Sequence, residues 1–220
     1  MLANDSASPH SWTPADITTA WVHGWVLSRN APAPVDHGTH LSVAVGLPGH
    51  VVRHVFPTLA ADALRAVAGA SPVAGTWLKV AAAQDAVKPL LPAEWVVHAA
   101  EYLMHRSLAD MAAIPEAPSV EITREGPVVT ATLRGPDGDL AARAQAAVSG
   151  TAAIFDQVVT EPQHRRKGYG SLLMSQLAKA CREQGATLGV LVATEDGRHL
   201  YSALGWTVST EVTAASFGVE

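Results

Sequence analysis

The most constraining feature of the sequence is a change of hydrophobic period at Gly168. The residues before it, from Thr151 to Thr160, are largely apolar and indicate a strand. The residues after it, up to Gln184, repeat with helical spacing, and Gly185 then stands where a helix typically ends. The apolar stripe of this helix consists of Leu173, Leu177, Ala180 and Cys181. The sequence therefore predicts a strand, a loop and a strong helix in direct succession.

The loop between this strand and helix is basic and contains two glycines. Its basic residues are Arg165, Arg166 and Lys167, followed by Gly168 and Gly170. The first N–H groups of a helix have no partners inside it, and the helix dipole adds positive potential there. Glycine lets a phosphate approach the backbone closely. The layout predicts an anion site that could hold a diphosphate; an ordinary solvated basic loop is the alternative.

The remainder of the C-terminal half alternates short strands and turns. Strands are expected at 119–124, 128–134, 140–148 and 151–160, separated by turns rich in glycine and proline, which indicates an antiparallel meander. An apolar strand at 187–193, a short helix capped by Asp196 and strand material from Trp206 to Val219 complete this half.

The N-terminal half reads as a separate unit that mixes helices and strands. Thr13 and Pro14 start a helix over 14–29, and Thr58 is expected to cap a helix reaching Ala68. Strands are expected at 39–45, 51–56 and 76–82, then a short helix at 84–91 and one or two strands over 95–104. The resulting division is a polar tail at 1–13, a first unit at 14–110, a proline-containing linker at 111–118 and a second unit at 119–220.

The two units contain one segment that aligns without gaps. The segment from Thr76 lies on the segment from Thr187, and both have the order strand, helix, strand. The matched pairs are Thr76 and Thr187, Ala82 and Ala193, Asp85 and Asp196, Trp95 and Trp206, and Val97 and Val208. The first unit is therefore interpreted as a degenerate copy of the second, with chance alignment of alanine-rich segments as the alternative.

Composition excludes several classes of protein. A chain of 220 residues with 48% hydrophobic residues can bury a core, and its net charge of -5 argues against nucleic-acid binding. The lone Cys181 cannot form an internal disulfide, and the first residues lack a signal-peptide pattern, so we expect a cytoplasmic protein with no membrane role. Cys181 lies in the apolar helix stripe and is expected to be a buried, inert thiol.

The histidines of the N-terminal half do not form a metal-binding motif. His50 and His54 stand four apart on a predicted strand, where they would share one polar surface face, and His37 and His40 are expected to be solvated in a loop. No metal is therefore expected.

Two motifs in the C-terminal half resemble the GNAT superfamily of N-acetyltransferases. The first, Arg165-x-x-Gly168-x-Gly170, is similar to its R/Q-x-x-G-x-G/A signature; the second, Leu200-Tyr201-Ser202-Ala203-Leu204-Gly205-Trp206, is similar to its LYxxxGF segment. The resemblance covers about residues 119 to 220. It implies an α/β (α+β) fold with a mixed, mainly antiparallel sheet flanked by helices. The implied activity is transfer of an acetyl group from acetyl-CoA, as cosubstrate, to an amine through a ternary complex.

The resemblance also implies roles for individual residues. Tyr201 would be the general acid that protonates the leaving coenzyme A thiolate. Asp156 is a candidate for the base that deprotonates the amine, and Glu161 and His164 are further candidates near the mouth of the site. The strand role, pairing with the pantetheine arm, falls to Val158, Val159 and Thr160, and the diphosphate role falls to Arg165, Arg166, Lys167, Gly168, Tyr169, Gly170 and Ser171.

One departure from the family pattern concerns the acceptor. The family places two helices between its first two strands, whereas here only Glu125-Gly126-Pro127 separates them. We expect the N-terminal unit to replace this wall, so that the acceptor lies between the halves. Lining candidates there are Trp21, Trp25, Trp77 and Trp95, although most tryptophans end in cores. The acceptor stays open between a small amine, an amino acid, an antibiotic, a polyamine and a protein lysine, and a homodimer is compatible with the sequence.

Two other functions stay open. An acyl-CoA sensor would keep the loop but lose turnover, although Tyr201 is retained. A dinucleotide-binding oxidoreductase would use Gly168-x-Gly170 differently, but Leu173 occupies the position of its third glycine.

Overall fold

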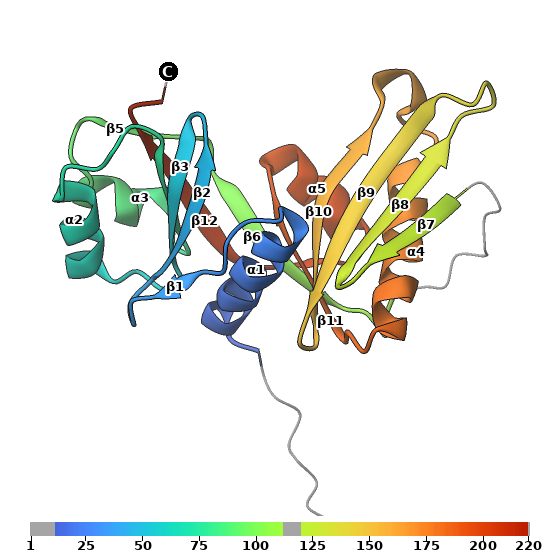
Figure 1. Cartoon of the computed structure of the whole chain (residues 1–220), viewed down its shortest axis with the longest axis horizontal. Helices are drawn as coiled ribbons and strands as arrows, with labels where there is room; N and C mark the ends of the chain where they lie inside the picture. Colours follow the sequence, from blue (N-terminus) through green and yellow to red (C-terminus); the bar gives the residue numbers. More distant parts are fainter. Residues whose placement is uncertain (1–11, 112–119, 220) are drawn as a thin grey trace, which may run out of the picture.

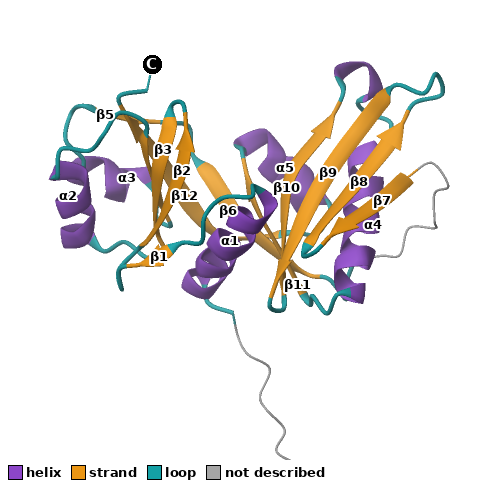
Figure 2. Ribbon diagram, in the orientation of Figure 1, coloured by secondary structure: helices purple, strands orange, loops and turns teal. Residues whose placement is uncertain are grey.

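One continuous sheet organises the molecule, with helices on both of its faces (Figures 1 and 2). The structure is a computed structural model that describes residues 12–111 and 120–219. Its twelve strands run in the order β1-β2-β3-β4-β12-β6-β11-β10-β9-β8-β7, and β5 pairs with β12 beside this path. The expected fold class, a mixed and mainly antiparallel sheet flanked by helices, is confirmed.

The elements follow the expected order along the chain. The N-terminal half contains α1 (Pro14–Ser28), β1 (Val35–Asp36), β2 (Leu41–Leu47), β3 (His50–Phe56), α2 (Ala61–Gly69), β4 (Thr76–Val80), α3 (Gln84–Val87), a 3-10 turn (Lys88–Leu90), β5 (Trp95–Val97) and β6 (Glu101–Ser107). The C-terminal half contains β7 (Val120–Glu125), β8 (Val128–Arg134), β9 (Leu140–Ser149), β10 (Ala152–Thr160), a 3-10 turn (Pro162–His164), α4 (Tyr169–Glu183), β11 (Leu188–Ala193), α5 (Glu195–Ala203) and β12 (Thr207–Phe217).

Two predicted helix caps are wrong. Helix α2 begins after Ala60 and has no side-chain cap, so Thr58 lies outside the helix. Helix α5 is capped by Thr194, whose hydroxyl accepts a hydrogen bond from the amide of Gly197, so Asp196 lies inside the first turn. Thr194 has the extended backbone that a cap requires, and Asp196 is thereby free to present its carboxylate elsewhere.

The predicted tail and linker lie largely or wholly outside the described residues, which omit 1–11, 112–119 and 220. Within the part of the chain that is described, no helix is both long and apolar enough to cross a bilayer.

The halves exchange their last strands. Strand β6, from the N-terminal half, pairs with β11, whereas β12, the last strand of the chain, pairs with β4 and β5. These two strands also pair with each other in the centre of the sheet. The predicted units at 14–110 and 119–220 therefore share one sheet.

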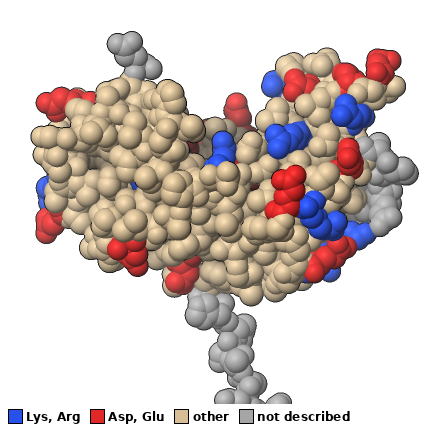
Figure 3. Space-filling view, viewed as in Figure 1, with Lys and Arg blue, Asp and Glu red and all other residues tan. Residues whose placement is uncertain are grey.

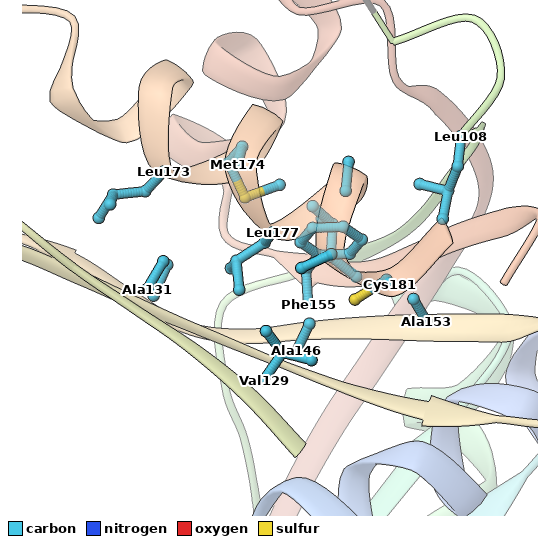
Figure 4. Packing of buried hydrophobic residues seen from close by; sticks show 14 of the residues in the cluster. Leu108, Val129, Ala131, Ala146, Ala153, Phe155, Leu173, Met174, Leu177 and Cys181 are labelled. Carbon is cyan, nitrogen blue, oxygen red and sulfur yellow. The ribbon is translucent and has the colours of Figure 1, made fainter. Parts of the chain in front are cut away.

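Three hydrophobic cores lie along this sheet. The largest lies between α4 and the meander, where Leu173, Met174 and Leu177 pack on small residues such as Ala131 and Ala146 (Figure 4). Cys181 is buried in it, and burial raises the pKa of this thiol to about 12, as an inert cysteine requires. A third core lies under α2 and includes Trp95.

The second core joins the two halves through α1. Its members come from α1, from β2 and β3, from β10 and β11, and from the exchanged strands β6 and β12. Helix α1 lies in front of the sheet between the two halves (Figure 1). Gly24 permits this close packing, because a Cβ added there would lie 2.3 Å from Cδ1 of Ile154. The N-terminal half thus covers part of the sheet face of the C-terminal half.

Candidate functional site

Strands β10 and β11 separate after a short paired stretch. Their parallel pairing covers only Ala152 to Ile154, opposite Leu188 to Val190. Beyond it β10 continues to Thr160 along β9, with an irregularity between Asp156 and Val159, while β11 continues along β6. The backbone groups of the second part of β10 therefore have no partner strand on the β11 side. This edge can accept an extended ligand by strand-like pairing.

The basic loop leads directly into the exposed N-terminus of α4. Gly168 precedes the helix with φ of +79°, a left-handed conformation that favours glycine, and no side chain caps the helix. Arg165, Arg166 and Lys167 are exposed, and within the described residues none of them forms an ion pair. Unsatisfied amides and unpaired cations thus meet at one point, which suits an anion.

A pocket of about 540 Å³ joins this loop to the end of β10. Its lining residues are Val158, Val159, Thr160, Arg165, Arg166, Gly168, Tyr169, Gly170, Ser171, Leu200 and Tyr201. These include every residue predicted for cofactor binding except Lys167, together with the predicted general acid. A Cβ added at Gly170 would meet nothing nearer than Oγ1 of Thr160 at 3.9 Å, so space lies open in front of this amide.

A second pocket of about 660 Å³ lies on the other side of Tyr201. It shares Val158, Arg165, Leu200 and Tyr201 with the first pocket and extends between the separated strands to the start of α5. Asp156 and Asp196 are its two carboxylates. Sequence reasoning assigned Asp196 to a helix cap and so missed it as a site residue.

Tyr201 lies where the two pockets meet. Its ring packs edge-on against Trp206, with centroids 6.1 Å apart, and burial raises the pKa of its hydroxyl to about 12. The hydroxyl therefore keeps its proton throughout the neutral range. It can act as a hydrogen-bond donor or as a proton donor, but not as a base.

The geometry of Asp156 does not favour a role as base. Both of its oxygens accept hydrogen bonds from Arg29, from Nε at 2.5 Å and from a terminal nitrogen at 2.9 Å. The hydroxyl of Ser28 and the amide of Gln157 also donate to it, at 3.1 Å and 2.9 Å. A carboxylate satisfied by four donors fixes the end of α1 to β10 and has little capacity left for a substrate proton.

The other two base candidates differ in position. His164 is only 6% exposed, and its Nε2 lies 2.7 Å from Oδ2 of Asp139. It therefore anchors the basic loop to the β8–β9 hairpin instead of facing the pockets. Glu161 is partly exposed at the end of β10 but lines neither pocket.

The tryptophans of the N-terminal half are divided between cores and the junction of the halves. Trp95 is buried beside Phe217 under α2, remote from the junction. Trp21 and Trp25 belong to the core around α1. Trp77 is half-buried, and its Nε1 donates to the carbonyl of Gly49 at 2.8 Å.

Two predictions about histidines are wrong. His40 is buried and stacks on Phe56 with centroids 4.8 Å apart, so it is not solvated. His50 and His54 are half-buried, and burial is the main cause that lowers the pKa of each to about 4. His50 packs against the rings of Trp25 and Trp77, and His54 packs beside the ring of His40, so neither forms polar surface.

The structure has no helices between β7 and β8, where the family pattern places two. The turn at Gly126 connects β7 and β8 directly, and β7 pairs with β8 along its full length. A pocket of about 720 Å³ lies in front of β7, β8 and β9 and is closed on one side by the end of α1. The first helix of the N-terminal half thus stands beside the open face of the sheet.

Comparison with known proteins identifies this arrangement. Residues 137–214 match the family model of FR47-like protein. A GCN5-related N-acetyltransferase from Kribbella flavida is similar over 93% of this chain and 95% of its own, with 17% identity and a TM-score of 0.65. The chain has the GNAT fold. No curated protein matches the sequence.

Two further GNAT structures extend over nearly the whole chain. An acetyltransferase of the GNAT family from Novosphingobium aromaticivorans covers 95% of this chain and is itself covered completely, with 18% identity and a TM-score of 0.61. A GCN5-related N-acetyltransferase from Sphaerobacter thermophilus covers 93% of each chain, with 10% identity and a TM-score of 0.54. The similarity to the GNAT fold thus includes the N-terminal half.

Proposed function

We propose that this chain is an N-acetyltransferase that transfers the acetyl group of acetyl-CoA to a primary amine. The observation that carries the proposal is the continuity of three parts: the open edge of β10, the exposed N-terminus of α4 with its three cations, and Tyr201 between two pockets. The first pocket suits the diphosphate and pantetheine arm of coenzyme A. The second pocket then receives the acetyl group and the amine.

The residues around the anion explain how coenzyme A would bind. Each charge-assisted hydrogen bond contributes about 1.5 to 3 kcal/mol, and an anion at a helix N-terminus gains about 0.3 to 1 kcal/mol more. Several such bonds from the loop can hold a diphosphate firmly. Arg165 is held toward β10, because its Nε donates to the carbonyl of Thr160 at 3.2 Å.

Tyr201 is suited to the departure of the thiolate. The amine attacks the acetyl carbonyl, and the tetrahedral intermediate then breaks its bond to sulfur. A tyrosine hydroxyl that keeps its proton at neutral pH can donate it to the developing thiolate, although its high pKa means that position contributes more than driving force.

A proton acceptor is needed because an amine with a pKa of about 10 is mostly protonated at neutral pH. Of the two carboxylates of the second pocket, Asp156 is bonded by four donors, whereas Asp196 is exposed and forms no hydrogen bond or ion pair within the described residues. Asp196 is therefore the better candidate to receive the proton, directly or through water.

Calorimetric titration with acetyl-CoA, with NAD(H) as control ligand, tests the cosubstrate. We expect micromolar binding of acetyl-CoA and none of NAD(H). Binding of NAD(H) instead would favour the oxidoreductase, although the pairing of β10 and β11 with antiparallel neighbours differs from a dinucleotide fold.

Replacing Tyr201→Phe tests turnover separately from binding. We expect a loss of at least about tenfold in turnover with little change in acetyl-CoA affinity. An equal loss of affinity would show that the ring packs the cosubstrate. Tight binding by the unmodified protein without acetyl transfer to any amine of a broad panel would favour the sensor.

A further inference from the structure

Arg53 occupies an unusual position at the junction of the two halves. It lies on β3, is half-buried, and its guanidinium stacks over the ring of Trp25 on α1, 4.0 Å from the centroid. Its Nε donates to Nε2 of His50 at 3.2 Å. Trp25 belongs to the core that joins β2 and β3 with β10 and β11. Figure 3 shows the surface hollowed between the two halves, with basic and acidic atoms in the hollow.

The charge of Arg53 is not neutralised by a partner. Within the described residues it forms no ion pair, although Glu101 and Asp156 are close enough to raise the pKa of its guanidinium. Both carboxylates already have cations of their own: Glu101 pairs with Lys79 at 2.5 Å, and Asp156 pairs with Arg29 at 2.5 Å. The cluster therefore has three cations and two carboxylates.

The neighbouring His50 does not change this excess of positive charge, because it is neutral. Burial and the charges of Arg53, Lys79 and Arg29 lower the pKa of His50 to about 4, so it is neutral and accepts the hydrogen bond from Arg53. Burial also lowers the pKa of Arg53 to about 10, which leaves the guanidinium charged at neutral pH. One positive charge is thus left over in a partly desolvated place.

The stack over Trp25 and the hydrogen bond to His50 stabilise Arg53 only in part, because neither partner carries a negative charge. Removal of a charge from water costs free energy unless a partner compensates it, and cores gain stability when such a group is replaced by an apolar one. Guanidinium groups form flat, two-pronged hydrogen bonds with carboxylates, and the terminal nitrogens of Arg53 form no hydrogen bond with any described residue.

Arg53 also lies within electrostatic reach of the reactive pocket. Arg53 stacks on Trp25 of α1, and the amide of Arg29 donates to the carbonyl of Trp25 at 3.0 Å. Arg29 pairs with Asp156, which lines the pocket that contains Tyr201. Arg29, paired with Asp156, contributes to the lowered pKa of both Arg53 and His50. A ligand held by Arg53 would therefore lie beside the pocket proposed for the amine.

We propose that Arg53 binds a carboxylate of the acceptor, so that the acceptor is an amine that also carries a carboxylate, as an amino acid does. The inference rests on the proposed acetyl transfer. It selects one substrate class among those that the sequence leaves open. The single excess charge of the cluster matches a monoanion, and the rings of Trp25 and Trp77, both in contact with His50, provide walls for the rest of the molecule.

The kinetic test compares amino acids with their amides, which differ in the carboxylate. Release of free coenzyme A thiol is measured with acetyl-CoA and each member of the panel. We expect kcat/KM to be at least about tenfold higher for an amino acid than for its amide, as the loss of one charge-assisted pair predicts. In Arg53→Met the two should react within about twofold of each other. Equal rates for acid and amide in the unmodified protein would overturn the proposal.

A melting experiment tests the same idea without turnover. If Arg53 serves a ligand, Arg53→Met should melt at the same or a higher temperature than the unmodified protein, because a half-buried charge without an ion-pair partner is removed while Met keeps an apolar contact with Trp25. A lower melting temperature would show that Arg53 is structural and would overturn the proposal. The control is Arg65→Met on α2, an exposed arginine paired only with Asp62, which should change neither the preference for acids nor the melting temperature.

Failure of the proposed function has a different signature. Arg53→Met should bind acetyl-CoA as the unmodified protein does. If the unmodified protein does not bind acetyl-CoA, the acetyltransferase itself is rejected; if it binds acetyl-CoA and acetylates amines without preference for a carboxylate, only the role of Arg53 is rejected.

Discussion

Strands β10 and β11 of the C-terminal half and strands β3 and β4 of the N-terminal half are both parallel pairs joined by a helix. The first pair is hydrogen-bonded over three residues and then opens, whereas the second is paired over five residues, the whole length of β4. In both halves the parallel pair follows an antiparallel hairpin, and its second strand adjoins a strand exchanged from the other half. The topology repeats, and common ancestry of the halves stays a prediction.

The helix that follows the first strand also differs between the halves. Helix α4 follows Gly168 and has no acidic residue in its first turn, whereas α2 follows Ala60 and has Asp62 in its first turn. Asp62 places a negative charge at the N-terminus of α2. The N-terminus of α4 has no such charge, so a bound anion can supply it. In the aligned segments Leu90 stands where Tyr201 stands. The comparison shows that an open strand edge and an uncompensated helix end distinguish the C-terminal half from the N-terminal half, although the two share a topology.

The largest effect is expected when α4 receives an acidic residue in its first turn, as α2 has. Gly170 and Asp62 are the second residues of their helices, so Gly170→Asp places a carboxylate where a phosphate would bind. We expect acetyl-CoA affinity, measured by calorimetry, to fall at least about 100-fold, because two or more charge-assisted bonds are lost. The control Gly170→Ala adds a methyl group with no carboxylate, and its effect should stay below about tenfold. Equal losses in the two variants would contradict an electrostatic cause.

Tyr201 can donate a proton, whereas Leu90 at the aligned position cannot, and the pH dependence of turnover tests this role of Tyr201. The raised pKa of Tyr201, about 12, means that its acid form is complete at every pH well below that value and is lost only as pH rises toward it. Turnover should therefore rise with pH as the amine loses its proton, and should show no falling limb below about pH 10. A falling limb near pH 8 would identify another acid.

A stability comparison tests whether α1 joins the halves as closely as the structure indicates. Gly24→Ala should destabilise the protein by about 1 to 3 kcal/mol, because its Cβ would overlap Ile154. Gly69→Ala, at the end of α2, meets nothing within 4 Å and should be neutral or slightly stabilising. Denaturant unfolding of both variants measures the difference. A tolerated Gly24→Ala would mean that α1 can move away from β10.

The smallest effect is expected at the anchor of the basic loop. The hydrogen bond from His164 is the largest cause that lowers the pKa of Asp139, so this carboxylate stays ionised at neutral pH and loses its charge only on acidification. Asp139→Asn should weaken acetyl-CoA binding by about two- to fivefold, through a less ordered loop. Turnover at saturating acetyl-CoA should be unchanged; a lower maximal rate would place this pair in the chemistry instead.

Local features of the C-terminal half could be predicted from the sequence. The period change at Gly168, the turns of the meander and the spacing from Arg165 to Tyr201 involve residues that are neighbours in the chain or in adjacent elements. Their geometry follows from local backbone rules, so one pocket between β10 and α4 contains almost all of the residues predicted for cofactor binding.

Features that depend on distant partners could not be predicted. The pairing of Asp156 with Arg29 joins residues 127 positions apart, and the burial of His40 depends on its packing against β3. The exchange of β6 and β12 has no sequence signal, because either strand could complete its own half. The environment of Arg53 likewise exists only after β3, α1 and β6 have come together.

The exchange of β12 has a consequence for synthesis. Strand β12 fills the position between β4 and β6, yet it leaves the ribosome after every other described strand. During translation β4 therefore presents an unpaired edge, with its N–H and C=O groups open to other chains, until the C-terminal strand arrives. The last strand to be made is the one that closes the centre of the sheet, and deletion of 207–217 should disable both halves.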